Sequence, residues 1–380
     1  MRVTRLALTD FRSYANAEID FASRVTTFVG PNGAGKTNVV EGLQFLSTLS
    51  SHRVASTVPL IRAGCERALV RATVERAGRT LAIEVTINAV GGNSARLNLS
   101  AARPREIAGI LRTVIFSPDD LDMVKGEPAG RRRFLDELAV ALSPKLAGDL
   151  ADYDRVVRQR STLLKSAKGR AADLSTLDVW DEKLVTLGAA ITSARLDVTA
   201  AIRPAVAEAY EDVSAGGGTC AVRYAVAAAG EVDLELSDDR RGEIERILIT
   251  ALARERSREI DRGVCLVGPH RDDLDLTIGD LPARGYASHG ESWSAALALR
   301  LGSYAMLTAD GGPDSGADGE PVLILDDVFA ELDAARREAL ARRVADARQV
   351  IVTAAVGADV PQALTGAVVG VENGRITTRG

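Results

Sequence analysis

The sequence predicts an α/β fold in which the two ends of the chain build one domain around a mainly helical insertion. Strand-like patterns dominate residues 1–130 and 262–380, whereas helical periodicity dominates residues 131–261. A glycine-rich loop lies in the first segment, and a strand that ends in two carboxylates lies in the last. Because one ligand needs both features, the outer segments must fold together into a first lobe, and the 380-residue chain is long enough for a second, inserted lobe.

The composition is that of an ordinary globular protein, with 46% hydrophobic and 26% charged residues. We expect no membrane span, since the apolar runs are too short, and no secretory signal, since charges are scattered through the first residues. Cys65, Cys220 and Cys265 are too far apart for a disulfide framework or a zinc knuckle, so we expect buried thiols and a cytoplasmic protein. At a net charge of −5, any DNA-binding surface must concentrate positive charge locally.

Periodicity places the elements of the two outer segments. Alternating patterns predict strands over 1–10, 19–28, 68–74, 81–87 and 114–116, with a turn at 77–78, and helical spacing predicts a helix over 36–49. In the last segment we expect strands over 264–267, 274–278, 322–325, 350–353 and 368–371, a helix over 331–345, a polar loop over 311–320 and a hairpin turn at 373–374.

The middle of the chain changes to helical periodicity from Arg131 to about Tyr210. Interruptions at Pro144, Gly169 and Pro204 exclude a long heptad coiled coil. A strand over 220–226 and a helix over 239–260 follow. One helical face consists of Tyr153, Val156, Val157, Arg160 and Leu164, and a second of Trp180, Leu184, Leu187 and Ile191.

Residues 30–37 read GPNGAGKT, a complete phosphate-loop pattern between a predicted strand and a predicted helix. Glycines let backbone N–H groups surround a β-phosphate, and the helix that follows directs its positive end at the same anion. Lys36 supplies charge for the β- and γ-phosphates, and the Thr37 hydroxyl can ligate Mg²⁺. The sequence therefore predicts that ATP is bound by Gly30, Pro31, Asn32, Gly33, Ala34, Gly35, Lys36, Thr37 and Asn38.

The apolar segment 322–325 ends in Asp326 and Asp327 and is the natural partner of the phosphate loop. Hydrolysis needs a group that holds the metal and one that orients water, so we expect Asp326 to bind Mg²⁺ and Asp327 to polarise the attacking water. The alternative is an ordinary strand that ends at an acidic helix cap.

Residues 286–291 read YASHGE and open a helical run. Ser288, Gly290 and Glu291 combine a hydroxyl, a residue that permits close approach and a helix N-terminus, which together make a second anion site. This motif is too short to be specific alone.

Together with residues 330–333 (AELD), these motifs resemble the heads of ABC-type ATPases, a class of P-loop NTPase. Those heads hold each nucleotide between the phosphate loop of one subunit and the signature serine of the other. The resemblance implies an ATP-dependent homodimer in which Ser288, Gly290 and Glu291 act in trans. It also places Arg12 near the nucleotide, although a solvated surface arginine remains an alternative.

The chain departs from ABC-type heads at two places. Their carboxylate strand usually ends Asp-Glu, whereas this one ends Asp326-Asp327, and the shorter second carboxylate leads us to expect slow turnover. They also commonly carry a histidine after the next strand, where residues 352–355 read VTAA. The γ-phosphate sensor is then absent or weakly replaced by Thr353.

Further segments resemble the RecF family within the SMC/RecF group: 8–14 (LTDFRSY), 116–121 (FSPDDL), 125–128 (KGEP), 131–136 (RRRFLD), 268–273 (GPHRDD) and 325–333 (LDDVFAELD). The resemblance spans nearly the whole chain. It implies a bacterial recombination mediator that binds ATP, dimerises on it at single-strand/double-strand DNA junctions and gaps, and helps load RecA with the RecO and RecR proteins. Such a protein is cytoplasmic and associates with the nucleoid when bound to DNA.

Two basic stretches are candidate DNA contacts, because each phosphate contact contributes salt-dependent affinity. The first of them could instead be a solvated helix start, because its three consecutive arginines cannot all share one face. The first is Lys125 with Arg131, Arg132 and Arg133, and the second is Arg155, Arg158, Arg160, Lys165, Lys168 and Arg170. His270 is either a nucleotide sensor or a structural histidine near a dimer interface, and His289 only shapes the signature loop.

Two other functions stay open. A transporter ATPase subunit predicts a shorter helical insertion, a Ser-Gly-Gly-Gln signature and a membrane partner. A binding module that uses ATP only to hold its dimer, with incidental hydrolysis, is compatible with an aspartate at position 327.

Overall fold

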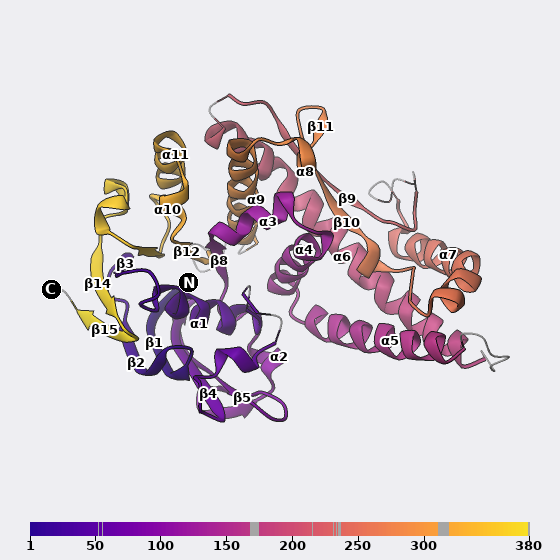
Figure 1. Ribbon diagram of the computed structural model, residues 1–380, viewed down its shortest axis with the longest axis horizontal. Coiled ribbons are helices and arrows are strands. Elements are labelled where there is room, and N and C mark those ends of the chain that lie inside the picture. The colour runs from indigo at the N-terminus through magenta and orange to yellow at the C-terminus, as the bar shows by residue number, and fades with distance from the viewer. Residues whose placement is uncertain are drawn as a thin grey trace.

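The computed structural model describes residues 1–51, 53–54, 56–167, 175–214, 216–230, 232, 234, 237–310 and 319–378. His52, Gly169 and two members of the second basic stretch, Lys168 and Arg170, lie outside these residues, as does most of the loop predicted over 311–320. Figure 1 shows that residues 1–116 and 322–378 occupy one side of the molecule, and that the helical middle occupies the other together with residues 273–286 of the last segment.

A six-stranded sheet joins the two ends of the chain. Its strand order is β15 (Arg375–Thr378), β14 (Ala367–Glu372), β3 (Val25–Val29), β13 (Val350–Ala354), β12 (Val322–Asp326) and β8 (Thr113–Phe116). All neighbours are parallel except β14 and β15, which form the predicted hairpin at 373–374. Strand β3 therefore lies between β14 and β13, and the expected joining of the outer segments is observed.

A second, antiparallel sheet is built entirely from the N-terminal part of the chain. Its order is β2 (Tyr14–Asp20), β1 (Arg2–Phe11), β4 (Arg67–Arg76), β5 (Arg79–Asn88), β6 (Ser94–Leu97) and β7 (Ser100–Ala102). The predicted turn between β4 and β5 places Ala77 and Gly78 at φ values of 50° and 69°, as a tight hairpin requires. Helix α1 (Lys36–Thr48) packs between the two sheets, and its apolar side chains share one core with both.

The other face of the parallel sheet carries the remaining helices, in a core that also includes a small sheet of β11 (Leu281–Pro282), β10 (Asp273–Ile278) and β9 (Cys220–Ala225). These helices are α3 (Leu121–Lys125), α4 (Pro128–Leu142), α5 (Leu146–Ala167), α6 (Ser175–Val213), α7 (Arg240–Arg262), α8 (Ala283–Tyr286), α9 (His289–Ala309), α10 (Val328–Glu331) and α11 (Ala334–Val344), while α2 (Pro104–Ile107) lies beside β6. The division at 131 and 262 stays a prediction, and β9 pairs with β10 across it.

Helix α6 runs unbroken for 39 residues, so the interruption predicted at Pro204 is wrong. Proline removes the bond to the carbonyl of Ala200, but both residues are exposed, so water can satisfy that carbonyl. By length and composition Thr176–Val213 could cross a membrane, with a hydropathy of 1.3 over its most apolar window. However, 56% of that window is buried, and the helix packs against α5, α7 and α9.

Two other predictions are corrected. Residues 264–267 form no strand, because Gly263 ends α7 in the left-handed conformation and the N–H of Leu266 donates to a carboxylate oxygen of Glu259 across 2.7 Å. The helix predicted over 331–345 is two helices, since Asp333 caps α11 by accepting from the N–H of Arg336. Cys220 and Cys265 are buried as expected, whereas Cys65 is partly exposed.

Candidate nucleotide-binding site

The phosphate loop joins β3 to α1, as the sequence predicts. Gly33 and Gly35 have φ values of 81° and 112°, a region that side chains rarely adopt. A Cβ atom at Gly35 would lie 2.9 Å from Ser13 Oγ, and the Tyr14 hydroxyl donates to the Gly35 carbonyl across 3.0 Å. The turn between β1 and β2 thus shapes the loop, and no side chain larger than glycine fits at position 35.

Lys36 lies folded back over the loop, with its side chain 3% exposed. Its Nζ atom donates to the carbonyls of Gly30 and Pro31 across 3.0 and 3.4 Å and lies 3.8 Å from Asp327 Oδ2. The charge therefore sits at the mouth of the loop, where an entering phosphate would replace these weaker acceptors.

Asp326 ends β12 directly beside the phosphate loop, so the pairing across the chain is observed. Its Oδ1 atom accepts from Thr37 Oγ1 across 3.1 Å and from Thr353 Oγ1 across 2.6 Å. Burial is the main cause that raises the pKa of Asp326 to about 6; the charge of Asp327 adds to it, and the two hydroxyl bonds oppose it. The oxygens of Thr37 and Asp326 converge as hard ligands, which suit Mg²⁺ together with nucleotide phosphates.

Asp327 adopts φ 50°, the left-handed region, at the N-cap of α10. Its N–H donates to Thr353 Oγ1 across 2.9 Å, and its carboxylate faces Lys36. Asp327 lines a cavity of about 500 Å³ above the phosphate loop, where a γ-phosphate and a water could be accommodated. The cavity is lined by Asn32, Gly33, Gly35, Lys36, Thr37, Asn38, Arg53, Pro118, Asp327, Ala330, Glu331 and Ala355.

The remaining predicted loop residues have structural contacts. The carbonyl of Ala34 accepts from the N–H of Gly374 across 3.0 Å, which ties the loop to the β14–β15 hairpin. Gly30 has no room for a Cβ atom, which would overlap the carbonyl oxygen of Val371. Asn38 Nδ2 donates to Ser13 Oγ across 3.0 Å.

Arg12 has partners within the protein, which corrects the alternative of a solvated surface arginine. Its guanidinium forms a bidentate ion pair with Glu41, at 2.8 and 2.6 Å, and donates to the carbonyl of Pro59. Its side chain is 17% exposed and is not among the residues that line the cavity above the loop. Arg12 is therefore not a solvated arginine, and its contact with the nucleotide stays a prediction.

Arg53 and Glu41 belong to the site and were missed. Arg53 Nη1 lies 3.1 Å from Asn38 Oδ1 and 3.3 Å from Glu41 Oε2, and it lines the cavity. Burial opposes ionisation of Glu41, but hydrogen bonds from Arg12 and Ser51 and the charges of both arginines hold its pKa below the usual value. An acidic residue inside the apolar run of α1 was the available signal.

The comparisons with known proteins agree with this geometry. The model of the RecF/RecN/SMC N-terminal domain family matches residues 2–377. The DNA replication and repair protein RecF of Streptomyces avermitilis is 53% identical over 373 residues, 96% of each chain, and that of Beutenbergia cavernae is 53% identical over 395 residues, 99% of each. The chain belongs to the RecF family.

Solved structures support the assignment. Two structures of the recombination mediator protein RecF in the RecFOR pathway, one of them described as RecF–ATP, have TM-scores of 0.88 and 0.86 at 26% identity. They cover 100% of this chain and 98% and 97% of theirs. The fold is shared with an SMC head bound to the C-winged helix domain of ScpA, which has 18% identity and a TM-score of 0.54. This match covers 100% of the present chain and 97% of the SMC head.

The signature of this RecF-family chain lies at the N-terminus of α9. Ser288 is the exposed N-cap: its Oγ accepts from the N–H of Glu291 across 3.2 Å, and Glu291 Oε2 accepts from the N–H of Ser288 across 2.8 Å. Gly290 packs against the guanidinium of Arg336, and a Cβ atom there would lie 2.7 Å from Arg336 Nη2, so the arginine side chain would have to shift. None of these three residues lines the cavity above the phosphate loop.

Two of the six predicted DNA contacts of this RecF-family chain are wrong, because they are buried. Arg131 forms a bidentate pair with Asp273, at 2.7 and 2.8 Å, with its side chain 4% exposed. Arg160 is fully buried between Asp181 and Glu259. The paired carboxylates are far away in sequence, so a run of arginines cannot reveal them.

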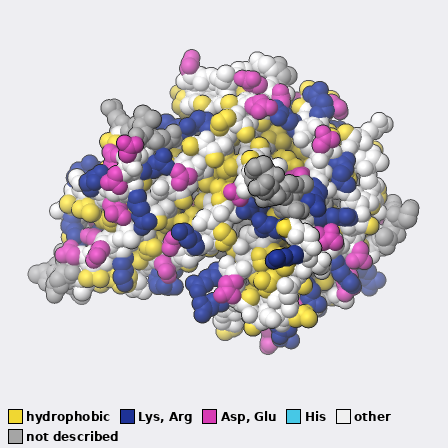
Figure 2. All heavy atoms as spheres, turned by 180° about the vertical axis from the view of Figure 1, so that it is seen from behind, with side chains coloured by type: hydrophobic (Ala, Val, Ile, Leu, Met, Phe, Trp, Pro, Cys, Tyr) yellow, Lys and Arg dark blue, Asp and Glu magenta, His cyan; other side chains and the backbone are white. Residues whose placement is uncertain are grey.

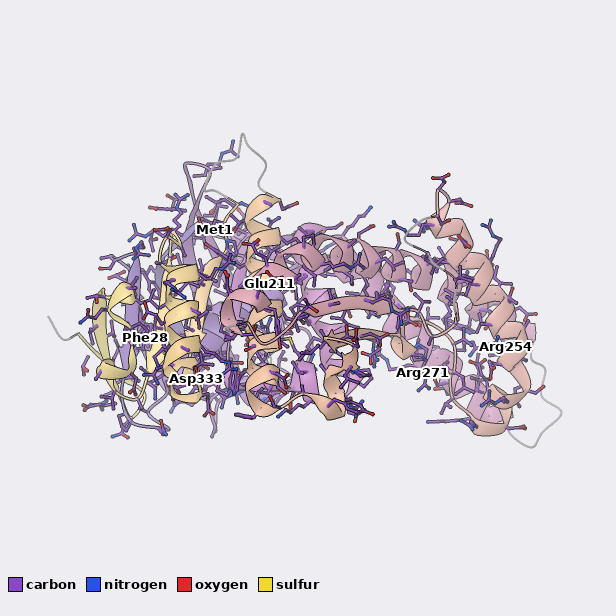
Figure 3. The ribbon with its side chains drawn as sticks, turned by 90° about the horizontal axis from the view of Figure 1, so that it is seen from above. Met1, Phe28, Glu211, Arg254, Arg271 and Asp333 are labelled. Carbon is purple, nitrogen blue, oxygen red and sulfur yellow. The ribbon has the colours of Figure 1, made fainter. Side chains whose placement is uncertain are left out.

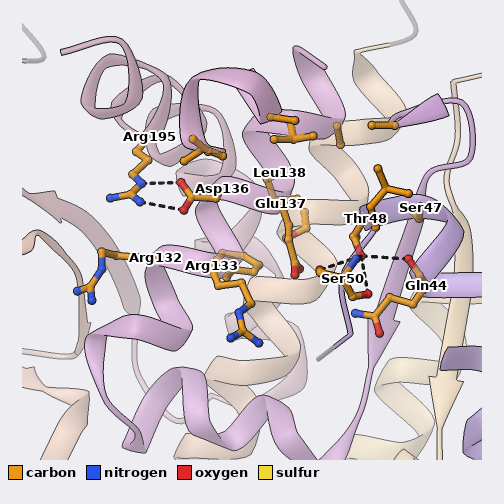
Figure 4. A pocket seen from close by; sticks show the side chains of 18 of the residues that line it. Gln44, Ser47, Thr48, Ser50, Arg132, Arg133, Asp136, Glu137, Leu138 and Arg195 are labelled. Atoms are coloured by element: carbon orange, nitrogen blue, oxygen red, sulfur yellow. Dashed lines mark hydrogen bonds and ion pairs between the residues drawn. The ribbon is translucent and has the colours of Figure 1, made fainter. Parts of the chain in front are cut away.

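The other basic candidates remain accessible. Arg132 is partly buried and donates to the carbonyl of Asp272 across 2.8 Å, whereas Arg133, Arg158 and Lys165 are exposed. Figure 4 shows Arg132 and Arg133 beside the ion pair of Asp136 and Arg195. All four line a cavity of about 690 Å³ that contains no phosphate-loop residue.

His270 lines this second cavity rather than the nucleotide site. Its Nδ1 atom lies 2.7 Å from the Tyr153 hydroxyl, and Nε2 lies 3.3 Å from the carbonyl of Cys265. Burial is the main cause that lowers the pKa of His270 to about 4, so the ring is neutral at pH 7. The contacts favour the structural interpretation over the nucleotide sensor.

Proposed function

We propose that this protein is an ATP-dependent DNA-binding protein of replication and recombinational repair. In this proposal it dimerises on ATP at single-strand/double-strand junctions and gaps, helps load RecA together with RecO and RecR, and resets by slow hydrolysis. The observation that carries it is the convergence of Lys36 and Thr37 with Asp326 and Asp327. Membership of the RecF family adds the connection to DNA repair.

The proposed ATP chemistry follows from the contacts. The phosphate loop and Lys36 bind the β- and γ-phosphates, and Thr37 and Asp326 hold Mg²⁺, which would neutralise charge on the phosphates when bound. Asp327 orients the attacking water. Because the Asp327 side chain is one methylene shorter than glutamate and is turned toward Lys36, the water is poorly placed and turnover is slow.

The proposed dimer explains why the signature is exposed in one chain. Ser288 and the positive end of α9 are exposed and lie apart from the cavity that the phosphate loop lines. An anion bound there would come from a second subunit, so each ATP would be held between the phosphate loop of one chain and Ser288, Gly290 and Glu291 of the other.

DNA would be bound through the exposed side chains of Arg133, Arg158 and Lys165. Lys125, which is also exposed and ends the helix before that of Arg133, would add a further contact. Figure 2 shows that Lys and Arg side chains are interspersed with Asp and Glu on the face it presents, without a field of one sign. Weak binding by a single chain would then become strong when two chains combine their contacts. We place such a protein in the cytoplasm and, when DNA-bound, in the nucleoid.

A binding module that uses ATP only to hold its dimer is the second candidate, favoured by the contact of Asp327 with Lys36 at 3.8 Å. A transporter ATPase subunit is disfavoured by the RecF-family membership.

The test is the affinity for gapped duplex DNA, measured by fluorescence anisotropy with ATP, with ADP and without nucleotide, against an intact duplex of the same length. We expect ATP to tighten binding to the gapped DNA by about 10-fold or more, a typical coupling between two sites. An affinity that is the same under all three conditions would contradict the proposal.

A further inference from the structure

The hydroxyl of Thr353 contacts both carboxylate residues of the nucleotide site. Thr353 is the next-to-last residue of β13, the strand beside β12, and lies in parallel register with Asp326. Its Oγ1 atom lies 2.6 Å from Asp326 Oδ1 and 2.9 Å from the backbone nitrogen of Asp327. The residue is 1% exposed, so this is a buried and closed arrangement.

The direction of the two bonds is fixed by chemistry. A hydroxyl has one proton to donate, and a backbone N–H can only donate. Thr353 Oγ1 therefore accepts from the N–H of Asp327 and gives its own proton to Asp326 Oδ1. With its proton in use and its side chain buried, Thr353 is not free to sense a γ-phosphate, which corrects the role considered for it as a substitute for the missing histidine.

The bond to Asp327 secures an unfavourable backbone. Asp327 has φ 50°, a left-handed conformation that is uncommon for a residue with a side chain. Its N–H reaches both Thr353 Oγ1 at 2.9 Å and the more distant Thr353 carbonyl at 3.3 Å. This backbone conformation directs the Asp327 carboxylate toward Lys36 and the cavity.

The bond to Asp326 secures a side chain. Asp326 Oδ1 receives two hydroxyl protons, from Thr37 on α1 and from Thr353 on β13. Mg²⁺ would displace or share the contact of Thr37, which is itself a candidate ligand, but it leaves the buried bond from Thr353 in place. Thr353 is then the contact that keeps Asp326 oriented when the metal is bound.

We propose that Thr353 is a positioning residue for ATP hydrolysis: one hydroxyl fixes the metal-binding carboxylate of Asp326 and the backbone that aims Asp327. This inference rests on the proposed function. It assigns to Thr353 an effect on the metal-dependent step, with little effect on contacts that the phosphate loop makes to nucleotide without metal.

The test is Thr353→Val, which keeps the branched shape and removes the hydroxyl. We expect kcat for ATP hydrolysis to fall about 10- to 100-fold, the usual effect of losing a group that orients a metal ligand. In EDTA, we expect the Kd of the variant for ATP to stay within about 2-fold of the wild-type value. Mg²⁺ tightens ATP binding by the wild type, and in the variant this tightening should be smaller by about the same factor as the fall in kcat. Thr353→Ser restores both quantities, because serine keeps the hydroxyl.

Thr192→Val is the matched control. Thr192 is fully buried on α6, and its hydroxyl has no hydrogen-bond partner within the part of the chain that the structure describes. The same chemical change there should leave kcat and both Kd values at the wild-type level. Thermal unfolding of each variant separates loss of fold from loss of positioning. If Thr353→Val does not fold, Thr353→Cys takes its place, since a thiol is a weak donor of similar size.

The outcomes are distinct. A Thr353→Val or Thr353→Cys variant with wild-type kcat and wild-type Mg²⁺-dependent tightening overturns the inference and leaves the proposed function intact. Equal weakening of ATP binding with and without Mg²⁺, or failure of Thr353→Ser to restore turnover, also overturns it, because the residue would then act on the phosphate loop or on packing. A wild-type protein that neither hydrolyses ATP nor binds it more tightly with Mg²⁺ refutes the proposed function itself.

Discussion

The phosphate-loop half and the signature half of the nucleotide site differ in how their polar groups are satisfied. On the phosphate-loop side, Lys36 and Asp326 have partners from distant parts of the same chain and are almost fully buried. On the signature side, Ser288 and Glu291 form a reciprocal pair of hydrogen bonds at the exposed end of α9, and the Ser288 carbonyl accepts from Ser292. The phosphate-loop half therefore has its partners within a single chain, and the signature half ends in an exposed helix N-terminus, which we propose binds the nucleotide of a second chain.

The same difference separates the arginines. Arg131 is closed in by Asp273 and two backbone carbonyls, whereas Arg133, two residues further along α4, is exposed. Figure 3 shows the molecule from above, with Phe28 of β3 and Asp333 near one end and Arg254 of α7 near the other. Substitution of a buried group that has its partners within the chain, a closed group, should change the stability or ATP binding of the isolated subunit. Substitution of an exposed group, an open group, should change only the binding of DNA or of a second chain.

The largest effect is expected at the closed half of the nucleotide site. Lys36→Met removes the charge that faces the phosphates, so we expect the Kd for ATP to rise about 1000-fold, or about 4 kcal/mol. Isothermal titration calorimetry measures this on the isolated chain. ATP binding within 10-fold of the wild type would show that the loop does not bind the phosphates through Lys36.

Arg131→Ala should reduce the free energy of unfolding by about 3–5 kcal/mol, because it leaves Asp273 and two carbonyls without their buried partner. Arg133→Ala is the matched control and should change it by less than about 0.5 kcal/mol, while it weakens DNA binding and lowers its salt dependence. Urea denaturation and anisotropy at several salt concentrations check the pair. Equal stability losses at both positions would remove the distinction between closed and open arginines.

A smaller effect is expected from His270, in the dependence of the free energy of unfolding on pH. Its pKa falls from 6.5 to about 4 on folding, so the unfolded chain binds the proton more tightly. The stability that this residue contributes is complete above pH 6.5 and is lost as pH falls toward 4, by up to about 3 kcal/mol. Urea denaturation between pH 7 and 4 should show a flatter profile for His270→Gln, and identical slopes would contradict a buried neutral ring.

The smallest effect on the isolated chain is expected at the open half. Ser288→Arg should leave the Kd of monomeric protein for ATP within about 2-fold, since the residue lies apart from the cavity, and should prevent ATP-dependent dimerisation because the bulky side chain sterically blocks the exposed helix end. Calorimetry and analytical ultracentrifugation give the two readings. Loss of ATP binding by the monomer would place Ser288 in the site of its own chain.

Much of the closed half could be predicted from sequence, because local patterns carry it. The glycine spacing predicts a phosphate loop, and the apolar segment before Asp326 predicts a strand that ends in a carboxylate. Both predictions depend on local sequence alone and need no knowledge of how the two segments come together. The joining of the two ends followed from the need for one ligand. What failed depends on distant partners: Arg131 looked accessible because Asp273 lies far along the chain, and Pro204 looked like a break because its exposure could not be known.

The contacts that tune the site were also beyond the sequence. The sequence suggested Thr353 only as a weak substitute for a histidine, whereas in the structure its hydroxyl lies between Asp326 and Asp327. Arg53 and Glu41 have no motif of their own, and their roles depend on which side of α1 faces the β1–β2 turn. Such residues are set by packing between elements, which periodicity within one element does not report.

The most direct test of the shared nucleotide site is a mixing experiment with two inactive variants. A Lys36→Met chain keeps an intact signature, and a Ser288→Arg chain keeps an intact phosphate loop. Neither alone should dimerise on ATP, but an equimolar mixture should form ATP-dependent heterodimers and recover hydrolysis, because one composite site is whole. A mixture that remains as monomeric and inactive as its components would contradict a site shared between two chains.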